Sequence, residues 1–232
     1  MLTKEEISKL EKKYFEAIDK LLSLNIIKVI TQINSQKLYL LPTSTDRANS
    51  IEHAIESIIE QLIAEKLNWL VASLPASADS CYEVGDAVVH IDAKTVHIED
   101  GDHTNNKVNV QENQTTYDST QEIFLSEAKN DPWKPNLKHF ETHDYYGVIP
   151  NLTYIVKLSY SDKNLVEELK LISLPHGIFF DDLKESILGA GKTLAPADKN
   201  GLRKRGNIRF LFNKVIETTG HEWRENLIYK KV

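Results

Sequence analysis

The stretch that decides the fold runs from Ala78 to Thr95 and reads Ala-Asp-Ser-Cys-Tyr-Glu-Val-Gly-Asp-Ala-Val-Val-His-Ile-Asp-Ala-Lys-Thr. Gly85 and Asp86 stand between two apolar runs, a pattern that is typical of a two-residue β-hairpin turn with glycine in the first position. When the turn is centred there, counting outward along both strands brings Asp79 directly opposite Asp92. The pattern therefore predicts an antiparallel hairpin with two facing carboxylates.

The hairpin gathers three charged side chains on one face. Cross-strand partners have Cβ atoms about 4.5–5.5 Å apart, and residues two apart on a strand share a face, so Lys94 lies beside Asp92 and Asp79. Facing carboxylates repel one another unless a divalent cation lies between them. Mg²⁺ prefers hard oxygen ligands and keeps several waters, one of which can attack a phosphate. The cluster predicts Mg²⁺-dependent phosphodiester hydrolysis, with an ordinary surface salt bridge as the alternative.

Asp86 is the rival for the first acid. If residues 86–92 form one straight strand, Asp86 and Asp92 lie about 20 Å apart, at roughly 3.3 Å per residue. Two carboxylates at that separation cannot share a metal ion, so Asp86 could serve only if the chain bends sharply between them. We therefore favour Asp79 and keep Asp86 as the alternative.

Hydrophobic periodicity predicts the elements around the hairpin. Apolar residues at three- and four-residue steps predict helices over residues 3–23 and 50–66, and alternating residues predict strands at Leu152–Tyr160 and Leu165–Leu174. The other expected elements are a strand at Ile26–Thr31, a short helix at Phe179–Leu188, a strand at Ile208–Phe212 and a closing helix from about Asn213. This order predicts an α/β (α+β) domain with a mixed β-sheet flanked by helices.

The composition is that of an ordinary globular protein. The chain has 232 residues, of which 41% are hydrophobic and 27% charged, and this balance excludes wholesale disorder. No run of about 18 apolar residues is present, so we expect no membrane partner. Acidic residues follow the first methionine where a secretory signal would be basic, and a single cysteine excludes a disulfide framework. We expect the protein in the cytoplasm.

Charge is distributed unevenly along the chain. The net charge is −6, yet residues 191–232 contain 10 Lys and Arg against 4 Asp and Glu, a balance of +6. A basic stretch on an acidic body predicts a phosphate-binding face, with a solvated surface as the alternative. The residues expected to contact DNA in this stretch are Lys199, Asn200, Arg203, Lys204, Arg205, Asn207 and Arg209.

A second candidate segment for DNA contact is polar and rich in amides. Amide side chains can read adenine edges and can also bind phosphates. An ordinary polar loop is the alternative. The residues expected to contact DNA here are Asn105, Asn106, Lys107, Asn109, Gln111, Asn113, Gln114 and Tyr117.

A family resemblance rests on the hairpin residues. Asp79-X12-Asp92-Ala93-Lys94 resembles the PD-(D/E)xK nuclease motif, and Ile91–Thr95 is similar to the Asp-X-Lys-Thr strand of type II restriction endonucleases. The close match covers about 17 residues. The proline of the motif is missing, because Pro75 stands four residues before Asp79.

The resemblance implies a set of site residues on a restriction-endonuclease-like core. It assigns the metal to Asp79, Asp92 and Ala93, and catalysis to these two acids and Lys94. Nucleases of this superfamily often add a glutamate from a preceding helix. Glu52 is the acid on residues 50–66 that is best placed to reach inward, and its alternative is a solvated position on the flank of that helix.

The function that the resemblance implies is Mg²⁺-dependent, sequence-specific cleavage of double-stranded DNA by a type II restriction enzyme. Two identical sites that cut two antiparallel strands predict a homodimer, and a cognate DNA methyltransferase is the expected genetic partner. The alternatives are a nicking nuclease of mismatch repair and a non-catalytic DNA-binding protein. We expect one nuclease domain over 1–232: an N-terminal helical and dimerisation region (1–45), a catalytic core (46–100), a continuation of the sheet (101–190) and a basic DNA-binding region (191–232).

Overall fold

The structure is a computed structural model that describes residues 2–35, 44–72, 80–117, 135–161, 165–191 and 207–231, without the side chains of 44–47 and 190. Its helices are α1 (Lys4–Ser35), α2 (Ser44–Lys66), α3 (Gly101–Thr104), α4 (Phe180–Leu183) and α5 (Phe212–Ile216), with 3₁₀ turns at Gly177–Phe179, Glu185–Ile187 and Glu222–Arg224. Its strands are β1 (Leu70–Val71), β2 (Ser80–Glu83), β3 (Val88–His97), β4 (Lys107–Gln111), β5 (Phe140–His143), β6 (Gly147–Tyr160), β7 (Val166–Ser173), β8 (Leu188–Ala190), β9 (Asn207–Leu211) and β10 (Glu225–Lys230).

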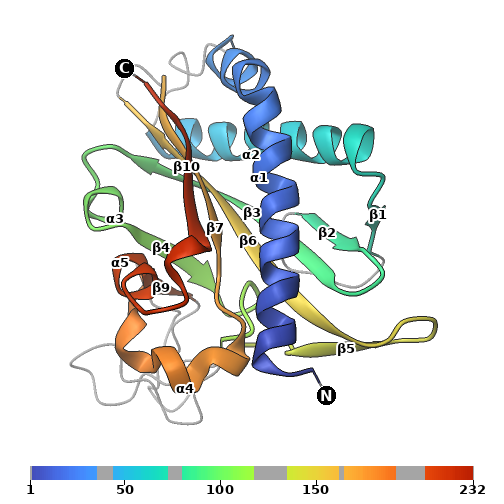
Figure 1. Ribbon diagram of the computed structural model, residues 1–232. Helices are drawn as coiled ribbons and strands as arrows, with labels where there is room; N and C mark the ends of the chain where they lie inside the picture. The colour runs from blue at the N-terminus through green and yellow to red at the C-terminus, as the bar shows by residue number, and fades with distance from the viewer. Residues whose placement is uncertain are drawn as a thin grey trace, which may run out of the picture.

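Two β-sheets form the frame of the molecule (Figure 1). The large sheet has the strand order β1-β2-β3-β6-β7-β10, with β5 paired to β6, and the small sheet has the order β4-β9-β8. Strands β3 and β6 are parallel, and the other pairs are antiparallel. The predicted α/β fold with a mixed sheet and flanking helices is confirmed.

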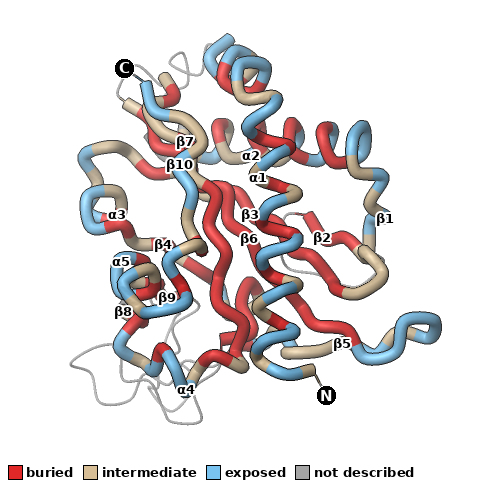
Figure 2. The backbone as a smooth tube through the Cα atoms, in the orientation of Figure 1, coloured by how far each residue is buried: buried red, intermediate tan, exposed pale blue. Residues whose placement is uncertain are grey.

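The large sheet is buried between two layers. On one face lie α1 and α2: the Tyr154 hydroxyl on β6 donates to the carbonyl of Glu11 on α1, and the Thr95 hydroxyl on β3 lies 3.3 Å from the carbonyl oxygen of Ala48 on α2. On the other face Lys157 of β6 donates to carbonyls at α3 and at the start of β4. Figure 2 shows that β3, β6 and β7 are buried along most of their length. These central strands therefore form the buried middle of the molecule, with α1 and α2 on one side and α3 and β4 on the other.

Helix α1 is longer than predicted, and the strand expected at Ile26–Thr31 is wrong. The β-branched run Ile26-Ile27 and Val29-Ile30 favours a strand locally. However, Val29, Ile30 and Ile33 are buried and continue the apolar stripe of the helix at three- and four-residue steps. Packing against the sheet therefore overrides the local preference, as tertiary context commonly does.

The closing helix is also shorter than predicted. Helix α5 ends at Ile216, and the chain returns as β10, which pairs with β7 at the edge of the large sheet. None of the helices in the described part of the chain is long and apolar enough to cross a membrane.

A buried ion pair joins α1 to the segment just before β10. Arg224 and Glu11 are 0% and 1% exposed, and the Arg224 Nη2 lies 2.6 Å from the Glu11 Oε2. The other Glu11 oxygen accepts from the main-chain N–H of His176 at 2.9 Å, and the Arg224 Nε donates to the His221 Nδ1 at 2.8 Å. Burial, with the Arg224 cation nearby, lowers the pKa of His221 to about 4, so its ring stays neutral and can accept. Both charges are thus hydrogen-bonded away from water.

Candidate active site

The hairpin formed by β2 and β3 has the register that the sequence predicts. Strands β2 and β3 pair Glu83 with Val88 and, at the other end, Ser80 with Ile91. The turn lies at Gly85, whose φ of +86° is a conformation that favours glycine. Asp79 lies outside the described residues. The structure therefore shows the predicted register as far as Ser80, the residue next to Asp79.

Asp92 and Lys94 lie together on β3. The Asp92 carboxylate is fully buried, and its Oδ2 forms an ion pair with the Lys94 ammonium. The Lys94 side chain is 18% exposed. Buried charges are usually paired or hydrogen-bonded because leaving them unpaired is costly. The alternation along β3 thus places both groups on the face of the large sheet that looks toward the small sheet.

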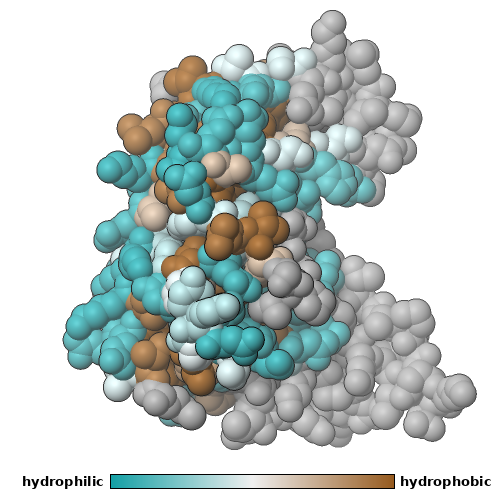
Figure 3. All heavy atoms as spheres, turned by 90° about the vertical axis from the view of Figure 1, so that its right-hand side faces the viewer, coloured by the Kyte–Doolittle hydropathy of each residue, from teal (hydrophilic) through white to brown (hydrophobic). Residues whose placement is uncertain are grey.

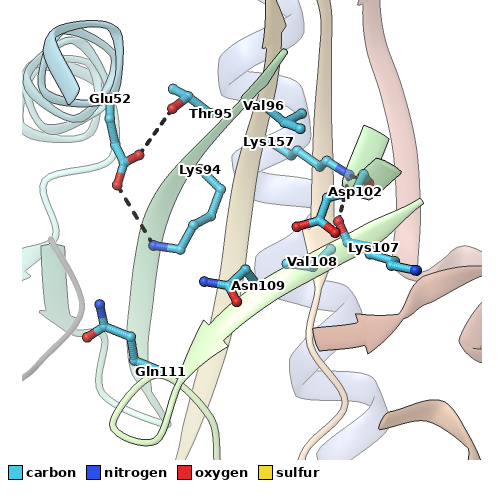
Figure 4. Close-up of a pocket in the computed structure, with 10 residues that line it drawn as sticks. All are labelled: Glu52, Lys94, Thr95, Val96, Asp102, Lys107, Val108, Asn109, Gln111 and Lys157. Atoms are coloured by element: carbon cyan, nitrogen blue, oxygen red, sulfur yellow. Dashed lines mark hydrogen bonds and ion pairs between the residues drawn. The ribbon is translucent and has the colours of Figure 1, made fainter. Parts of the chain in front are cut away.

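Glu52 reaches the same site from α2. Its Oε1 lies 4.0 Å from the Lys94 Nζ, and its Oε2 accepts a hydrogen bond from the Thr95 hydroxyl at 3.3 Å. Figure 4 shows Glu52 and Lys94 pointing toward one another across the space beside β3. The structure therefore brings Glu52 together with Asp92 and Lys94, as expected of an inward-reaching acid and not of a solvated flank position.

Glu52 and Lys94 come from two sides of the large sheet. Helix α2 covers the face of β3 that carries Thr95, and Lys94 lies on the other face. The Lys94 Nζ nevertheless lies 4.0 Å from the Glu52 Oε1, so this long side chain links the two layers at the edge of the cavity.

A cavity of about 200 Å³ opens beside this cluster (Figure 4). Its lining includes Glu52 from α2, Lys94 from β3 and Lys157 from β6, together with three residues of β4: Lys107, Asn109 and Gln111. Carboxylate oxygens are the ligands that hard divalent cations prefer, so Asp92 and Glu52 could supply ligands to a cation at its edge. Lysines on the opposite wall would attract an anion. The cavity thus suits an anionic group bound next to a cation.

Lys157 is a site residue that the sequence did not reveal. It pairs in register with Lys94 on the parallel strand, and it donates to the carbonyls of Asp102 and Lys107 at 3.0 and 2.8 Å. Burial, reinforced by the nearby Lys170 cation, lowers the pKa of Lys157 to about 8. Its position in the site depends on the pairing of β3 with β6, which local sequence patterns do not show.

Asp86, the rival for the first acid, lies elsewhere. It sits in the turn of the hairpin, where its carboxylate accepts from the Tyr14 hydroxyl and lies 2.5 Å from the Lys13 Nζ of α1. The chain runs along β3 between Asp86 and Asp92 without the sharp bend that a shared metal would require. The structure therefore rules out Asp86 as a partner of Asp92.

Several residues expected to contact DNA are buried instead. Tyr117 is 0% exposed and packs against Phe210, because it joins the core beneath the small sheet. Asn106 is 8% exposed, with its amide donating to Asn213 and Glu225. These two side chains hold elements of the fold together, so the structure corrects their predicted role at a surface.

Two more residues predicted to contact DNA are bonded to acidic residues of the protein itself. Arg209 donates from its Nε to the Asp102 carboxylate at 2.7 Å and is 18% exposed, and Gln114 is 3% exposed and donates to Asp92. The remaining described candidates are at least partly exposed: Asn105, Lys107, Asn109, Gln111, Asn113 and Asn207. Five candidates lie outside the described residues: Lys199, Asn200, Arg203, Lys204 and Arg205.

Comparisons with solved structures show the same fold in two restriction enzymes. The restriction endonuclease BglI, solved bound to its DNA recognition sequence, is 15% identical, with a TM-score of 0.66 over 87% of this chain and 84% of its own. The tetrameric restriction endonuclease SfiI, solved bound to cognate DNA, is 16% identical, with a TM-score of 0.70 over 97% of this chain and 85% of its own.

A comparison of families is more specific than the likeness in fold. No curated protein matches the chain. The family model described as the N-terminal domain of the type II restriction enzyme MwoI matches residues 3–164, which is more than half of the chain and includes α1, α2 and the hairpin with Asp92 and Lys94. The chain therefore belongs to the family of the N-terminal domain of the type II restriction enzyme MwoI.

Proposed function

We propose that this protein is a Mg²⁺-dependent endonuclease that cleaves double-stranded DNA at a specific sequence, as a type II restriction enzyme. The observation that carries the proposal is the meeting of Asp92, Lys94 and Glu52 beside one cavity. The family match and the two neighbours solved with DNA support the choice of DNA as substrate.

The donor set at the site fits Mg²⁺. Among the described residues no three His, Cys, Asp or Glu side chains gather closely enough to hold a metal ion. Mg²⁺ does not require such a cage, because it is usually held by one or two carboxylates, with waters and substrate phosphates as its other ligands. We assign Asp92, with Asp79 and the main-chain carbonyl of Ala93, to this role. The four observed pairs of the hairpin support the placement of Asp79 opposite Asp92.

Each charged group has a distinct part in the proposed reaction. A bound Mg²⁺ supplies charge neutralisation at the scissile phosphate and activation of a water. We assign Lys94 to orient the attacking water or to stabilise negative charge that develops on the phosphate. Glu52 lies 4.0 Å from the Lys94 Nζ and accepts from Thr95, so it holds the lysine on the side of the cavity.

A cleavage assay tests the proposal. We expect the purified protein to cut unmodified double-stranded DNA into discrete fragments with Mg²⁺ present, and to stop when EDTA removes the metal. Nicks near mismatches would instead indicate a repair enzyme. If the protein binds DNA but does not cleave it with any divalent metal ion, it is a non-catalytic DNA-binding protein. A DNA methyltransferase encoded next to this chain, whose modification blocks the fragments, is the expected genetic companion.

The homodimer belongs to the same proposal. Two copies would place one active site on each strand of a palindromic duplex. Apolar side chains are exposed on β1 and at the start of β6, where Leu70, Val71 and Val148 are 67%, 80% and 58% exposed. Figure 3 shows hydrophobic atoms among hydrophilic ones on the side of the molecule that carries these strands. Sedimentation with and without DNA would measure the number of copies.

The basic stretch gives a prediction about DNA affinity. Arg203, Lys204 and Arg205 precede β9, and removing one side chain that neutralises a phosphate should lower the log–log salt slope by about 1. We expect alanine at all three positions to reduce that slope by about 3 and to weaken binding to all sequences, when affinity is measured with Ca²⁺ in place of Mg²⁺.

Arg209 serves as the matched control in this experiment. Because it is bonded to Asp102, Arg209→Ala should leave the salt slope unchanged and instead lower the free energy of unfolding by about 1–3 kcal/mol, as expected when a buried charged group loses its partner. A slope that falls in Arg209→Ala but not in the triple variant would move the DNA contact to β9 itself.

A further inference from the structure

The side chain of Gln114 joins the turn after β4 to the candidate metal ligand. Its Nε2 donates to the Asp92 Oδ1 at 2.7 Å, and its Oε1 accepts from the main-chain N–H of Gln111 at 2.9 Å. The N–H of Gln114 closes the same turn by donating to the Gln111 carbonyl at 3.0 Å. Only 3% of Gln114 is exposed. Main chain and side chain are therefore both fixed by short local contacts.

These partners also fix which way the amide faces. If the amide were reversed, its oxygen would lie against the Asp92 carboxylate and its NH₂ group against the Gln111 N–H. Both contacts would then be repulsive, since neither would pair a donor with an acceptor. The only arrangement that satisfies both ends presents an N–H to Asp92.

We propose that Gln114 is a positioning residue that holds the Asp92 carboxylate in the orientation required to bind the catalytic metal. This inference rests on the function proposed above. Lys94 contacts one oxygen of Asp92 and Gln114 contacts the other, so rotation of the carboxylate is restricted from both sides. Hydrogen bonds of this kind orient the ligands of metal sites and tune their affinity.

The chemistry of glutamine suits this position. A second cation in place of Gln114 would stabilise the Asp92 carboxylate but would repel a divalent metal bound to it. A neutral amide donates a hydrogen bond to the anion and adds no charge. Gln114 can therefore fix the carboxylate without competing with the metal for it.

The placement of Gln114 excludes the direct contact with DNA that the sequence predicts for it. A DNA base could not reach an amide that is 3% exposed and whose oxygen and nitrogen are both engaged. Gln111, at the other end of the same turn, is exposed and lines the cavity, so it remains available to a substrate. The turn thus carries one inward-facing and one outward-facing glutamine.

The test replaces Gln114 by methionine, which keeps the unbranched shape but cannot donate. The matched control is Gln61→Met on the exposed side of α2, where the glutamine bonds only a neighbouring Glu65 among the described residues. Mg²⁺ affinity is measured by calorimetry without DNA, and cleavage is measured as a function of Mg²⁺ concentration. We expect Gln114→Met to bind Mg²⁺ about 10-fold to 100-fold more weakly and to regain most of its cleavage rate at saturating Mg²⁺, with the control unchanged.

A second variant covers the case in which Gln114→Met does not fold. Gln114→Asn keeps the amide on a side chain one carbon shorter, so its N–H is withdrawn from Asp92. We expect it to weaken Mg²⁺ binding in the same direction. Wild-type Mg²⁺ affinity in a folded variant overturns the positioning role. Unchanged Mg²⁺ affinity with weaker DNA binding at saturating Ca²⁺ also overturns it, because Gln114 would then support the DNA-binding surface and not the metal ligand.

The outcomes separate this inference from the proposed function. If the wild-type protein cleaves DNA with Mg²⁺ while the variants bind Mg²⁺ as it does, only the role of Gln114 is wrong. If the wild-type protein neither binds Mg²⁺ nor cleaves DNA, the proposed function is wrong and the role of Gln114 falls with it.

Discussion

Asp92→Asn should reduce Mg²⁺-dependent cleavage of DNA by about 10³-fold or more. Asparagine keeps the shape of the buried side chain but removes the negative charge that would hold the metal. A catalytic metal contributes several kcal/mol of stabilisation to the transition state, and each 1.36 kcal/mol is a factor of about ten in rate. Lys94→Ala should cost about 10²-fold to 10³-fold, as the loss of one group that stabilises developing charge usually does. Single-turnover cleavage at saturating Mg²⁺ measures both effects.

The control for these variants is Asp86→Asn at the turn of the same hairpin. Asp86 contacts Tyr14 and Lys13 of α1 and lies away from the cavity, so its loss should leave the cleavage rate within about twofold. Thermal unfolding of all three variants shows whether they are folded. Near-normal cleavage by a folded Asp92→Asn variant would contradict the catalytic assignment, and a large loss in Asp86→Asn would show that damage to the hairpin, and not loss of a metal ligand, explains the effect.

Replacing Arg224 by alanine should lower the free energy of unfolding by about 3–5 kcal/mol. The change leaves the Glu11 carboxylate buried without its cation, and breaking a buried pair by removing one partner has costs of this size. At about 2–4 °C per kcal/mol for a chain of this length, the midpoint of thermal unfolding should fall by roughly 6–20 °C. Urea unfolding followed by circular dichroism measures the free energy directly.

Two variants separate the buried charge from general damage to α1. Glu5→Ala removes an exposed ion pair with Lys9 on the same helix and should leave the midpoint of thermal unfolding nearly unchanged. The double variant Glu11→Leu with Arg224→Met should recover part of the loss, because apolar residues of similar volume often replace a buried pair without penalty, while the main-chain N–H of His176 loses its acceptor. If the double variant were as unstable as Arg224→Ala, packing and not charge would explain the effect.

Local sequence patterns predict the parts of the site that lie on the hairpin and on α2. Gly85 and Asp86 at the turn set the register of β2 and β3, and the two-residue period of a strand places Lys94 beside Asp92. The helical period of α2 then singles out Glu52, which the structure brings to Lys94. Each of these steps depends on residues within one element or across one short turn.

The residues that the sequence did not reveal depend on contacts between distant segments. Lys157 faces the cavity because β6 pairs in parallel with β3. Gln114 and Tyr117 lie in the same polar stretch, but docking of the small sheet buries them both, one beside Asp92 and the other in the core. The buried partners Glu11 and Arg224 look like ordinary surface charges in the sequence. No local period distinguishes such residues from solvated ones.

The pairing of Glu11 with Arg224 has a consequence for synthesis of the protein. The two residues are 213 positions apart in the chain. At about 5–20 residues per second, the ribosome adds Arg224 roughly 10–40 s after Glu11. During that interval the carboxylate on the nascent first helix has no cation to accompany it out of water. The helix can therefore bury that face only late in translation, after the chain that carries Asp92 and Lys94 has already been made.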